Sequence, residues 1–178
     1  MIKLDIGSGG KSADSTFIGV DAFAEGADVK AFMWDLPYED NSVDVIICMQ
    51  ALEHVTKYAV VPTLREWHRV LKPGGKLQLQ VPDLEWACIH WLSHQTTGWN
   101  IDVIYGTQTH EGQYHKTGFS MQILGQYFAV AGGFNVLKAE YFGDSLEDAV
   151  HGITDVTQRC INIEAVKLGE LDEQKEKG

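Results

Sequence analysis

The stretch Asp5-Ile6-Gly7-Ser8-Gly9-Gly10-Lys11-Ser12 (DIGSGGKS) follows a short apolar strand and carries glycines at alternate positions, which is typical of a cofactor-binding loop. Its last three residues match the end of the phosphate-binding loop G-x-x-x-x-G-K-[ST]. That pattern needs a glycine where Asp5 stands, and a carboxylate there would repel the phosphates. The dinucleotide pattern G-x-G-x-x-G also fails, since its last position is Ser12. The stretch therefore favours a cofactor that the backbone approaches closely and that carries no pyrophosphate.

The composition is that of one ordinary globular domain, which we expect to cover residues 1–168 of the 178. No apolar run is long enough to cross a bilayer, and no secretory signal is visible, so we expect a cytoplasmic protein without a membrane partner. The net charge of −11 disfavours binding to nucleic acid, whose phosphates need clustered Lys and Arg. A small-molecule substrate is the expectation. Residues 169–178 are expected to form a charged, frayed tail.

Strands and helices alternate along the chain, which predicts a parallel, three-layer α/β sheet. Apolar runs predict strands, and the most continuous of them, 43–49, is expected at the centre of the sheet. The predicted strands are 2–6, 17–21, 29–33, 43–49, 76–82, 134–142 and 159–168; helices are expected from Pro62, after a cap at Asp83 and from Ser120 to Ala131, with a long loop or lid over 96–118.

The first two connections between strands are unusually short. Six residues separate Gly10 from Phe17, and seven separate Asp21 from Val29, so neither connection can hold a full crossover helix. One face of the first half of the sheet must therefore be thinly covered. A partner subunit could cover it, and for this reason we expect a homodimer.

Ligands of open α/β sheets bind beyond the carboxyl ends of the strands. An acidic residue at the end of the second strand is well placed to accept the hydroxyls of a ribose, which is the role that Asp21 would have. The residues to inspect at these ends are Asp5 to Gly10, Asp21, Asp35, Gln50 to His54, and Pro82 with Asp83.

Four segments together resemble the class I S-adenosylmethionine-dependent methyltransferases, over about residues 2 to 166. LDIGSGG resembles the first motif of the family, and VDA at 20–22 resembles the segment with the ribose-binding acid. WDLPYEDNSVDVIICMQALEHV resembles the adenine-contacting segment and the fourth strand. EWHRVLKPGGKLQLQVPD resembles the helix, turn and fifth strand that follow.

The resemblance implies a Rossmann-like, mostly parallel sheet of seven strands whose last strand is antiparallel, here with abbreviated first crossover helices. It implies that S-adenosylmethionine is the cofactor, with its methionine part at the glycines and its adenine framed by Asp35 and Leu36. The positive sulfonium tolerates acids that would repel a triphosphate. Lys11 departs from the family, which has a third glycine there. The implied cofactor-binding residues are Asp5, Gly7, Ser8, Gly9, Asp21, Ala22, Asp35, Leu36 and Gln50.

Methyl transfer is a direct displacement that depends mostly on alignment of the reacting atoms, so a dedicated base is optional. For a hydroxyl acceptor, a histidine would help to remove the proton. His115, in the long loop, and His54, after the central strand, are the candidate catalytic residues. His54 could equally be a capping or core imidazole.

Other chemistry is disfavoured by the sequence. His110, Glu111 and His115 could be metal ligands, but their loop offers no rigid spacing, so we expect no metal. The three cysteines are widely spaced in apolar segments, which is typical of buried free thiols. Ser8 lacks the glycine two residues before it that a hydrolase nucleophile elbow requires.

Two functions stay open. The first is methyl transfer from S-adenosylmethionine to an oxygen or nitrogen of a small molecule, a metabolite or a saccharide. The alternative is a catalytically inactive S-adenosylmethionine-binding partner or regulatory subunit. The lost third glycine favours the alternative, whereas Asp21 and Asp35 count against it.

Overall fold

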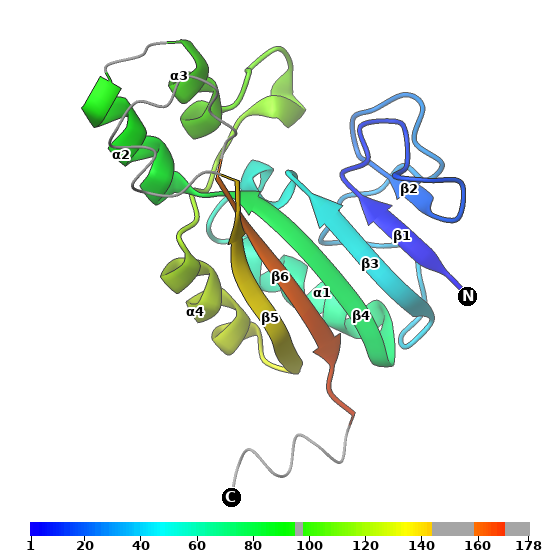
Figure 1. Ribbon diagram of the computed structural model, residues 1–178. Coiled ribbons are helices and arrows are strands. Elements are labelled where there is room, and N and C mark those ends of the chain that lie inside the picture. The colour runs from blue at the N-terminus through cyan, green and yellow to red at the C-terminus, as the bar shows by residue number, and fades with distance from the viewer. Residues whose placement is uncertain (95–97, 144–158, 170–178) are drawn as a thin grey trace, which may run out of the picture.

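The computed structural model of the chain describes residues 1–94, 98–143 and 159–169, and their strands form one sheet in the order β2-β1-β3-β4-β6-β5 (Figure 1). The first four strands are parallel, and β6 is antiparallel to both of its neighbours. The mostly parallel sheet with an antiparallel last strand is thus confirmed, with six strands in place of seven. Their bounds are Lys3–Ile6 (β1), Ile18–Val20 (β2), Val43–Met49 (β3), Leu71–Pro82 (β4), Phe134–Phe142 (β5) and Cys160–Lys167 (β6).

The missing strand is the one predicted at 29–33. Val29 alone pairs with β2: its N–H donates to the carbonyl of Gly19, and its carbonyl accepts from the N–H of Asp21. The chain then reverses, because the N–H of Asp35 donates to the carbonyl of Phe32. The prediction of a strand at 29–33 was therefore wrong, and the apolar residues there serve another purpose, described below.

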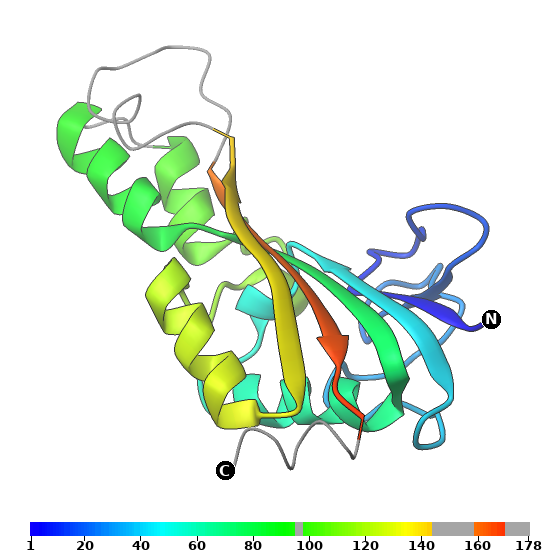
Figure 2. The ribbon, with the colours of Figure 1, turned by 60° about the horizontal axis from the view of Figure 1, so that its bottom comes forward.

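Two helices, α1 (Val60–Val70) and α4 (Met121–Ala131), pack on one face of the sheet (Figures 1 and 2). Leu64 and Trp67 of α1 are fully buried against the strands. As predicted, α4 begins after Ser120, whose side chain accepts a hydrogen bond from the N–H of Ile123. This layer covers one face of the sheet and buries its core residues.

The opposite face of the sheet carries no helix in the described part of the chain (Figure 2). The short connections therefore reduce the second helical layer of the predicted three-layer sandwich to loops. Alternate residues of β4 and β6 on this face are polar: Gln78 pairs with Glu164, and Gln80 donates to Asn162 at 2.9 Å. Polar side chains at these positions suit a face that meets water. The homodimer stays a prediction.

A second helical unit lies beyond the carboxyl end of β4 (Figure 1). It consists of α2 (Leu84–His94), whose second residue donates its N–H to Asp83, and α3 (Gly98–Tyr105). The prediction of an aperiodic loop over 96–118 was wrong where α3 lies. Val103 is buried against Trp86, so tertiary packing forms a helix that the sequence pattern did not indicate. No helix among the described residues has the length and apolar character needed to cross a membrane.

The C-terminal end of the chain is described only in part. The predicted tail at 169–178 lies outside the described residues, apart from Gly169. The three cysteines are free, and two of them, Cys48 and Cys160, are buried.

Candidate active site

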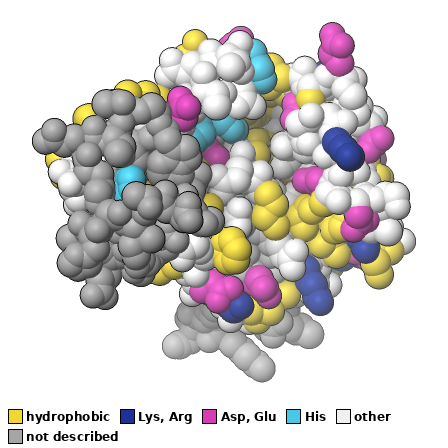
Figure 3. Space-filling view, turned by 45° about the horizontal axis from the view of Figure 1, so that its top comes forward, with side chains coloured by type: hydrophobic (Ala, Val, Ile, Leu, Met, Phe, Trp, Pro, Cys, Tyr) yellow, Lys and Arg dark blue, Asp and Glu magenta, His cyan; other side chains and the backbone are white. Residues whose placement is uncertain are grey.

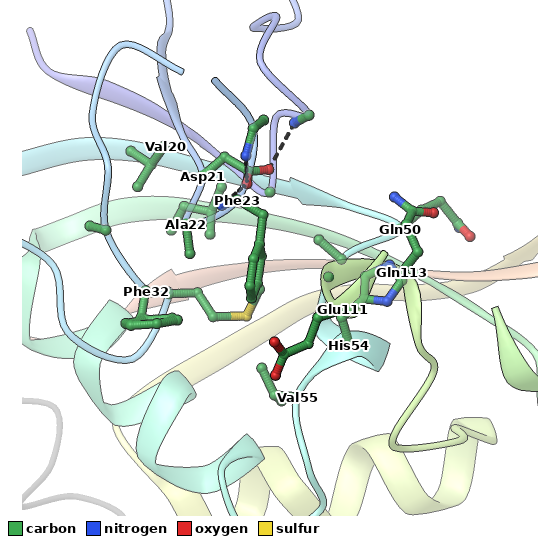
Figure 4. Close-up of a pocket in the computed structure, with 18 of the residues that line it drawn as sticks. Val20, Asp21, Ala22, Phe23, Phe32, Gln50, His54, Val55, Glu111 and Gln113 are labelled. Carbon is green, nitrogen blue, oxygen red and sulfur yellow. Dashed lines mark hydrogen bonds between the residues drawn. The ribbon is translucent and has the colours of Figure 1, made fainter. Parts of the chain in front are cut away.

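A pocket of about 530 Å³ opens at the carboxyl ends of β1, β2 and β3 (Figure 4). Its floor is formed by the loops after these strands, and the segment 110–116 faces them from the other side. Figure 3 shows this side of the molecule, where histidine side chains gather near the hollow. The residues that matter below are Gly7, Gly9, Asp21, Ala22, Phe23, Phe32, Trp34, Gln50, His54, His110, Glu111, Gly112 and Gln113.

The glycine loop brings backbone, rather than side chains, to the pocket. Gly7 has φ +76°, and a Cβ there would collide with the side chain of Ala51. Gly9 has φ +63°, and a Cβ there would meet no atom within 4 Å, because the residue faces open space at the pocket. Both positions favour glycine, and they let a ligand approach the main chain closely.

The Asp21 carboxylate is fixed by three backbone N–H groups (Figure 4). Its Oδ2 accepts from Gly9 at 3.0 Å, and its Oδ1 accepts from Phe23 at 2.7 Å and from Ala24 at 2.9 Å. Burial opposes ionisation, but the three donors outweigh it and lower the pKa of Asp21. Oδ1 already has two donors, whereas Oδ2 has one and keeps capacity for an external hydroxyl.

An aromatic rim, Phe23, Phe32 and Trp34, lines the same end of the pocket. The rings of Phe32 and Trp34 stack with centroids 4.7 Å apart and an interplanar angle of 11°, and Phe23 meets Phe32 edge-on. Sequence reasoning missed this rim and assigned one of its residues, Phe32, to a strand. Three aromatic residues within twelve positions were the available signal in the sequence.

The structure brings some of the predicted cofactor residues together and leaves others apart. Asp5 is buried below the pocket and accepts a hydrogen bond from the N–H of Ala13; burial raises its pKa. Asp35 is exposed, and Leu36 belongs to the core. Those at the pocket are Gly7, Gly9, Asp21, Ala22 and Gln50, and those outside its lining are Asp5, Ser8, Asp35 and Leu36.

Gln50 has a left-handed backbone, with φ +55°, which is uncommon for a residue with a side chain. Its N–H donates to the carbonyl of Gln80 at 2.9 Å, and its Nε2 donates to Gln80 Oε1 at 3.1 Å. These bonds hold the turn after β3 in its strained conformation. Gln50 lies on the opposite side of the pocket from Asp21 (Figure 4).

A second recess, of about 340 Å³, continues from this side of the pocket. Gln50, His54 and Gln113 line both spaces, so the recess is the natural place for a second ligand. The two predicted catalytic histidines meet here: the ring centroids of His54 and His115 are 4.9 Å apart.

Both histidines are oriented by backbone carbonyls. His54 Nδ1 lies 3.1 Å from the carbonyl oxygen of Tyr114, and His115 Nδ1 lies 2.8 Å from that of Val103. A carbonyl only accepts, so each Nδ1 carries a proton and each Nε2 keeps a lone pair. Burial lowers the pKa of both rings, which favours their neutral forms.

Glu53 completes this group; it lies in the stretch Gln50 to His54 that the sequence indicated, but it was given no role there. It lies in the short helical turn η1 (Leu52–His54) and is only 2% exposed. Its carboxylate oxygens have no hydrogen-bond partner among the described residues, and burial raises its pKa to about 8. Its Oε1 lies 4.0 Å from His115 Nε2. An acid inside the apolar run ALEHV was the available signal.

The segment Thr107 to Phe119 is tied to η1 and reaches over the pocket. The N–H groups of Lys116 and Thr117 donate to the carbonyl of Glu53 at 2.8 and 3.1 Å. At the pocket, Gly112 packs so closely on Phe23 that a Cβ would lie 2.7 Å from the ring. The segment thus brings His115 next to Glu53. His115 is not grouped with His110 and Glu111, its neighbours in the sequence.

Residues 4–79 match the family model of the methyltransferase domain. A SAM-dependent methyltransferase from Methanosarcina mazei has the same fold: the TM-score is 0.65 at 19% identity, over 94% of this chain and 92% of that one. The chain thus has the fold of such methyltransferases, and residues 4–79 are similar to a methyltransferase domain. The similarity supports an enzyme and S-adenosylmethionine as its cofactor, in line with the resemblance seen in the sequence.

Two further comparisons set the limits of this likeness. The demethylmenaquinone methyltransferase of Listeria welshimeri is 40% identical over 65 residues, which are 36% of this chain and 23% of the relative. The chain thus spans about a quarter of the length of that curated relative. A complex between the Haloferax volcanii Trm112 methyltransferase activator and a putative methyltransferase matches with a TM-score of 0.61 at 18% identity, over 94% of this chain and 83% of that one. At such identities the structures share the fold alone.

Proposed function

We propose that the protein transfers a methyl group from S-adenosylmethionine to an oxygen or nitrogen of a small molecule, a metabolite or a saccharide. The observation that carries the proposal is the fixed Asp21 carboxylate, which faces the pocket beside Gly9 with acceptor capacity left on Oδ2. A second recess lies next to this pocket, so donor and acceptor each have a space.

The residues of the pocket fit the cofactor. Gly7 and Gly9 would lie along its methionine part, Asp21 would accept a ribose hydroxyl, and Phe32 with Trp34 would offer a flat apolar surface to the adenine. When bound, the cofactor supplies a methyl group on a positively charged sulfur. The ionised Asp21 is compatible with that charge.

His54 and His115 are the proposed catalytic residues on the acceptor side. Backbone carbonyls hold both Nδ1 atoms, so the lone pair of each neutral ring lies on Nε2. Such lone pairs can take up the proton of the acceptor, or they can bind a cation that makes the acceptor more acidic. Thr107 to Phe119, which carries His115, would supply further polar contacts to the acceptor.

The test is a calorimetric titration of the protein with S-adenosylmethionine and S-adenosylhomocysteine, followed by a methyl-transfer assay on pools of metabolites and saccharides. Because the curated relatives are named as demethylmenaquinone methyltransferases, demethylmenaquinone is added as a comparison acceptor. Saturable binding with transfer to a small molecule supports the proposal. Binding without any transfer supports the inactive binding partner, and no binding overturns both.

A further inference from the structure

We propose that Glu53, His54 and His115 bind one divalent transition-metal ion in the recess beside the cofactor pocket. Each residue offers one ligand atom, and these atoms lie within 4.8 Å of one another. Ligands of a single ion with bonds of about 2.1 Å are about 3 to 3.5 Å apart, so small side-chain movements would close the set.

The frame that holds the three ligands is stiff. Glu53 and His54 are consecutive in η1, and His115 belongs to the segment that donates two N–H groups to the carbonyl of Glu53. The hydroxyl of Thr117 adds a third tie, to the carbonyl of Val55 at 2.7 Å. The ligand spacing therefore does not depend on a free loop.

The Glu53 carboxyl group is the second, independent observation. A buried carboxyl group without a hydrogen bond is costly, and most buried polar groups in proteins have a partner. A proton shared with His115 would not supply one, because 4.0 Å is well beyond hydrogen-bond length. An ion between the two side chains would satisfy the carboxylate and the imidazole together.

The histidines are held as metal ligands usually are. A metal-binding histidine commonly donates its other ring N–H to a carbonyl or carboxylate, which fixes the ring and its tautomer. The carbonyls of Tyr114 and Val103 do this for His54 and His115. With Nδ1 protonated, Nε2 carries the lone pair that an ion would use.

The ligand set decides the class of ion. Two imidazole nitrogens and one carboxylate oxygen suit Zn²⁺, Fe²⁺ and similar first-row ions better than Mg²⁺ or Ca²⁺, which prefer oxygen. Three protein ligands leave coordination positions open, as in catalytic zinc sites.

The catalytic role of the ion rests on the proposed function. The acceptor hydroxyl would bind the ion through its oxygen, its pKa would fall, and its proton would leave to water. The oxygen lone pair then forms the bond to the methyl carbon, and the carbon–sulfur bond breaks with its electron pair on sulfur. The products are the methylated acceptor and the neutral thioether S-adenosylhomocysteine, and the ion is unchanged.

The experiment is a metal titration of the full chain after treatment with a chelator. Zn²⁺ binding is measured by calorimetry, and Co²⁺ binding by visible absorption, which reports nitrogen and oxygen ligation directly. We expect one ion per chain. Glu53→Gln and His115→Ala should each weaken binding by at least about tenfold. The matched controls His110→Ala and Glu111→Gln, which alter the same segment outside the cluster, should change it by less than about twofold.

Circular dichroism confirms first that each variant is folded. The proposal is overturned if the wild-type chain shows no saturable binding, or if Glu111→Gln weakens binding as much as Glu53→Gln does. A titration with S-adenosylhomocysteine on the same samples separates the two proposals. Cofactor binding without metal binding rejects the ion alone, whereas metal binding without cofactor binding rejects the methyltransferase function and keeps the ion site.

Discussion

The N–H of Gly9 donates to Oδ2 of Asp21 at 3.0 Å, which ties the loop after β1 to the end of β2. The bond joins the two parts of the chain that contribute most to the pocket. It also means that Asp21 has two tasks, since the same carboxylate shapes the glycine loop and keeps one acceptor position for a ligand.

Asp21→Ala should weaken binding of S-adenosylhomocysteine by at least about tenfold, because a charged hydrogen bond worth roughly 1.5 to 3 kcal/mol is lost. Calorimetric titration of the folded variant measures this. Asp35→Ala is the matched control: Asp35 is exposed and outside the pocket lining, so we expect affinity within about twofold. Unchanged affinity in Asp21→Ala would remove Asp21 from the site.

Gly7→Ala should mainly lower the stability of the protein, whereas Gly9→Ala should mainly weaken cofactor binding. Gly7→Ala combines a positive φ with a collision against Ala51, so the free energy of unfolding should fall by at least about 2 kcal/mol. Gly9→Ala meets no atom of the protein and should cost only about 1 kcal/mol, but its methyl group enters the space of the cofactor. Urea unfolding and cofactor titration give both quantities. Equal losses of stability would contradict the described loop.

Glu66→Gln should make the free energy of unfolding fall less steeply as the pH is lowered into the acid range. The side chain of Glu66 accepts hydrogen bonds from Arg69 at 2.7 and 2.8 Å and from the N–H of Leu36 at 2.8 Å. The Arg69 bonds are the main cause that lowers the pKa of Glu66 below its ordinary 4.5, with burial opposing. A lowered pKa stabilises the folded state above pH 4.5, and this contribution is lost as the pH falls through the lowered value. Denaturation curves between about pH 6 and 3 test it; an unchanged slope in the variant would refute it.

His115→Ala should lower turnover by roughly 10² or more while it leaves the affinity for S-adenosylhomocysteine within about threefold. The reason is the division of the site, because His115 lines the recess and Asp21 the pocket. A paired rate assay and titration measure both effects. Full turnover would make the segment 107–119 an ordinary surface loop, and lost cofactor binding would show that the division is wrong.

Sequence patterns predicted the parts of the fold that local chemistry determines. Turn geometry and spacing were enough to predict three features. These are the acid and glycines after β1, the start of a helix at Ser120, and the connections around β2 that hold no helix. The helix α3 could not be predicted, because its stability comes from Val103 packing on Trp86. The grouping of Glu53 with His115 was also hidden, since 62 positions separate them and only the backbone bonds to η1 bring them together.

Calorimetry on the wild-type chain with three adenosine-containing ligands tests directly whether the pocket binds S-adenosylmethionine. S-adenosylhomocysteine should bind to a single saturable site, and ATP and NAD should bind far more weakly, because Asp21 faces the pocket and Lys11 is exposed outside its lining. If ATP bound as tightly as S-adenosylhomocysteine, the pocket would not be specific for the methyl donor, and the DIGSGGKS stretch would be better interpreted as a phosphate-binding loop.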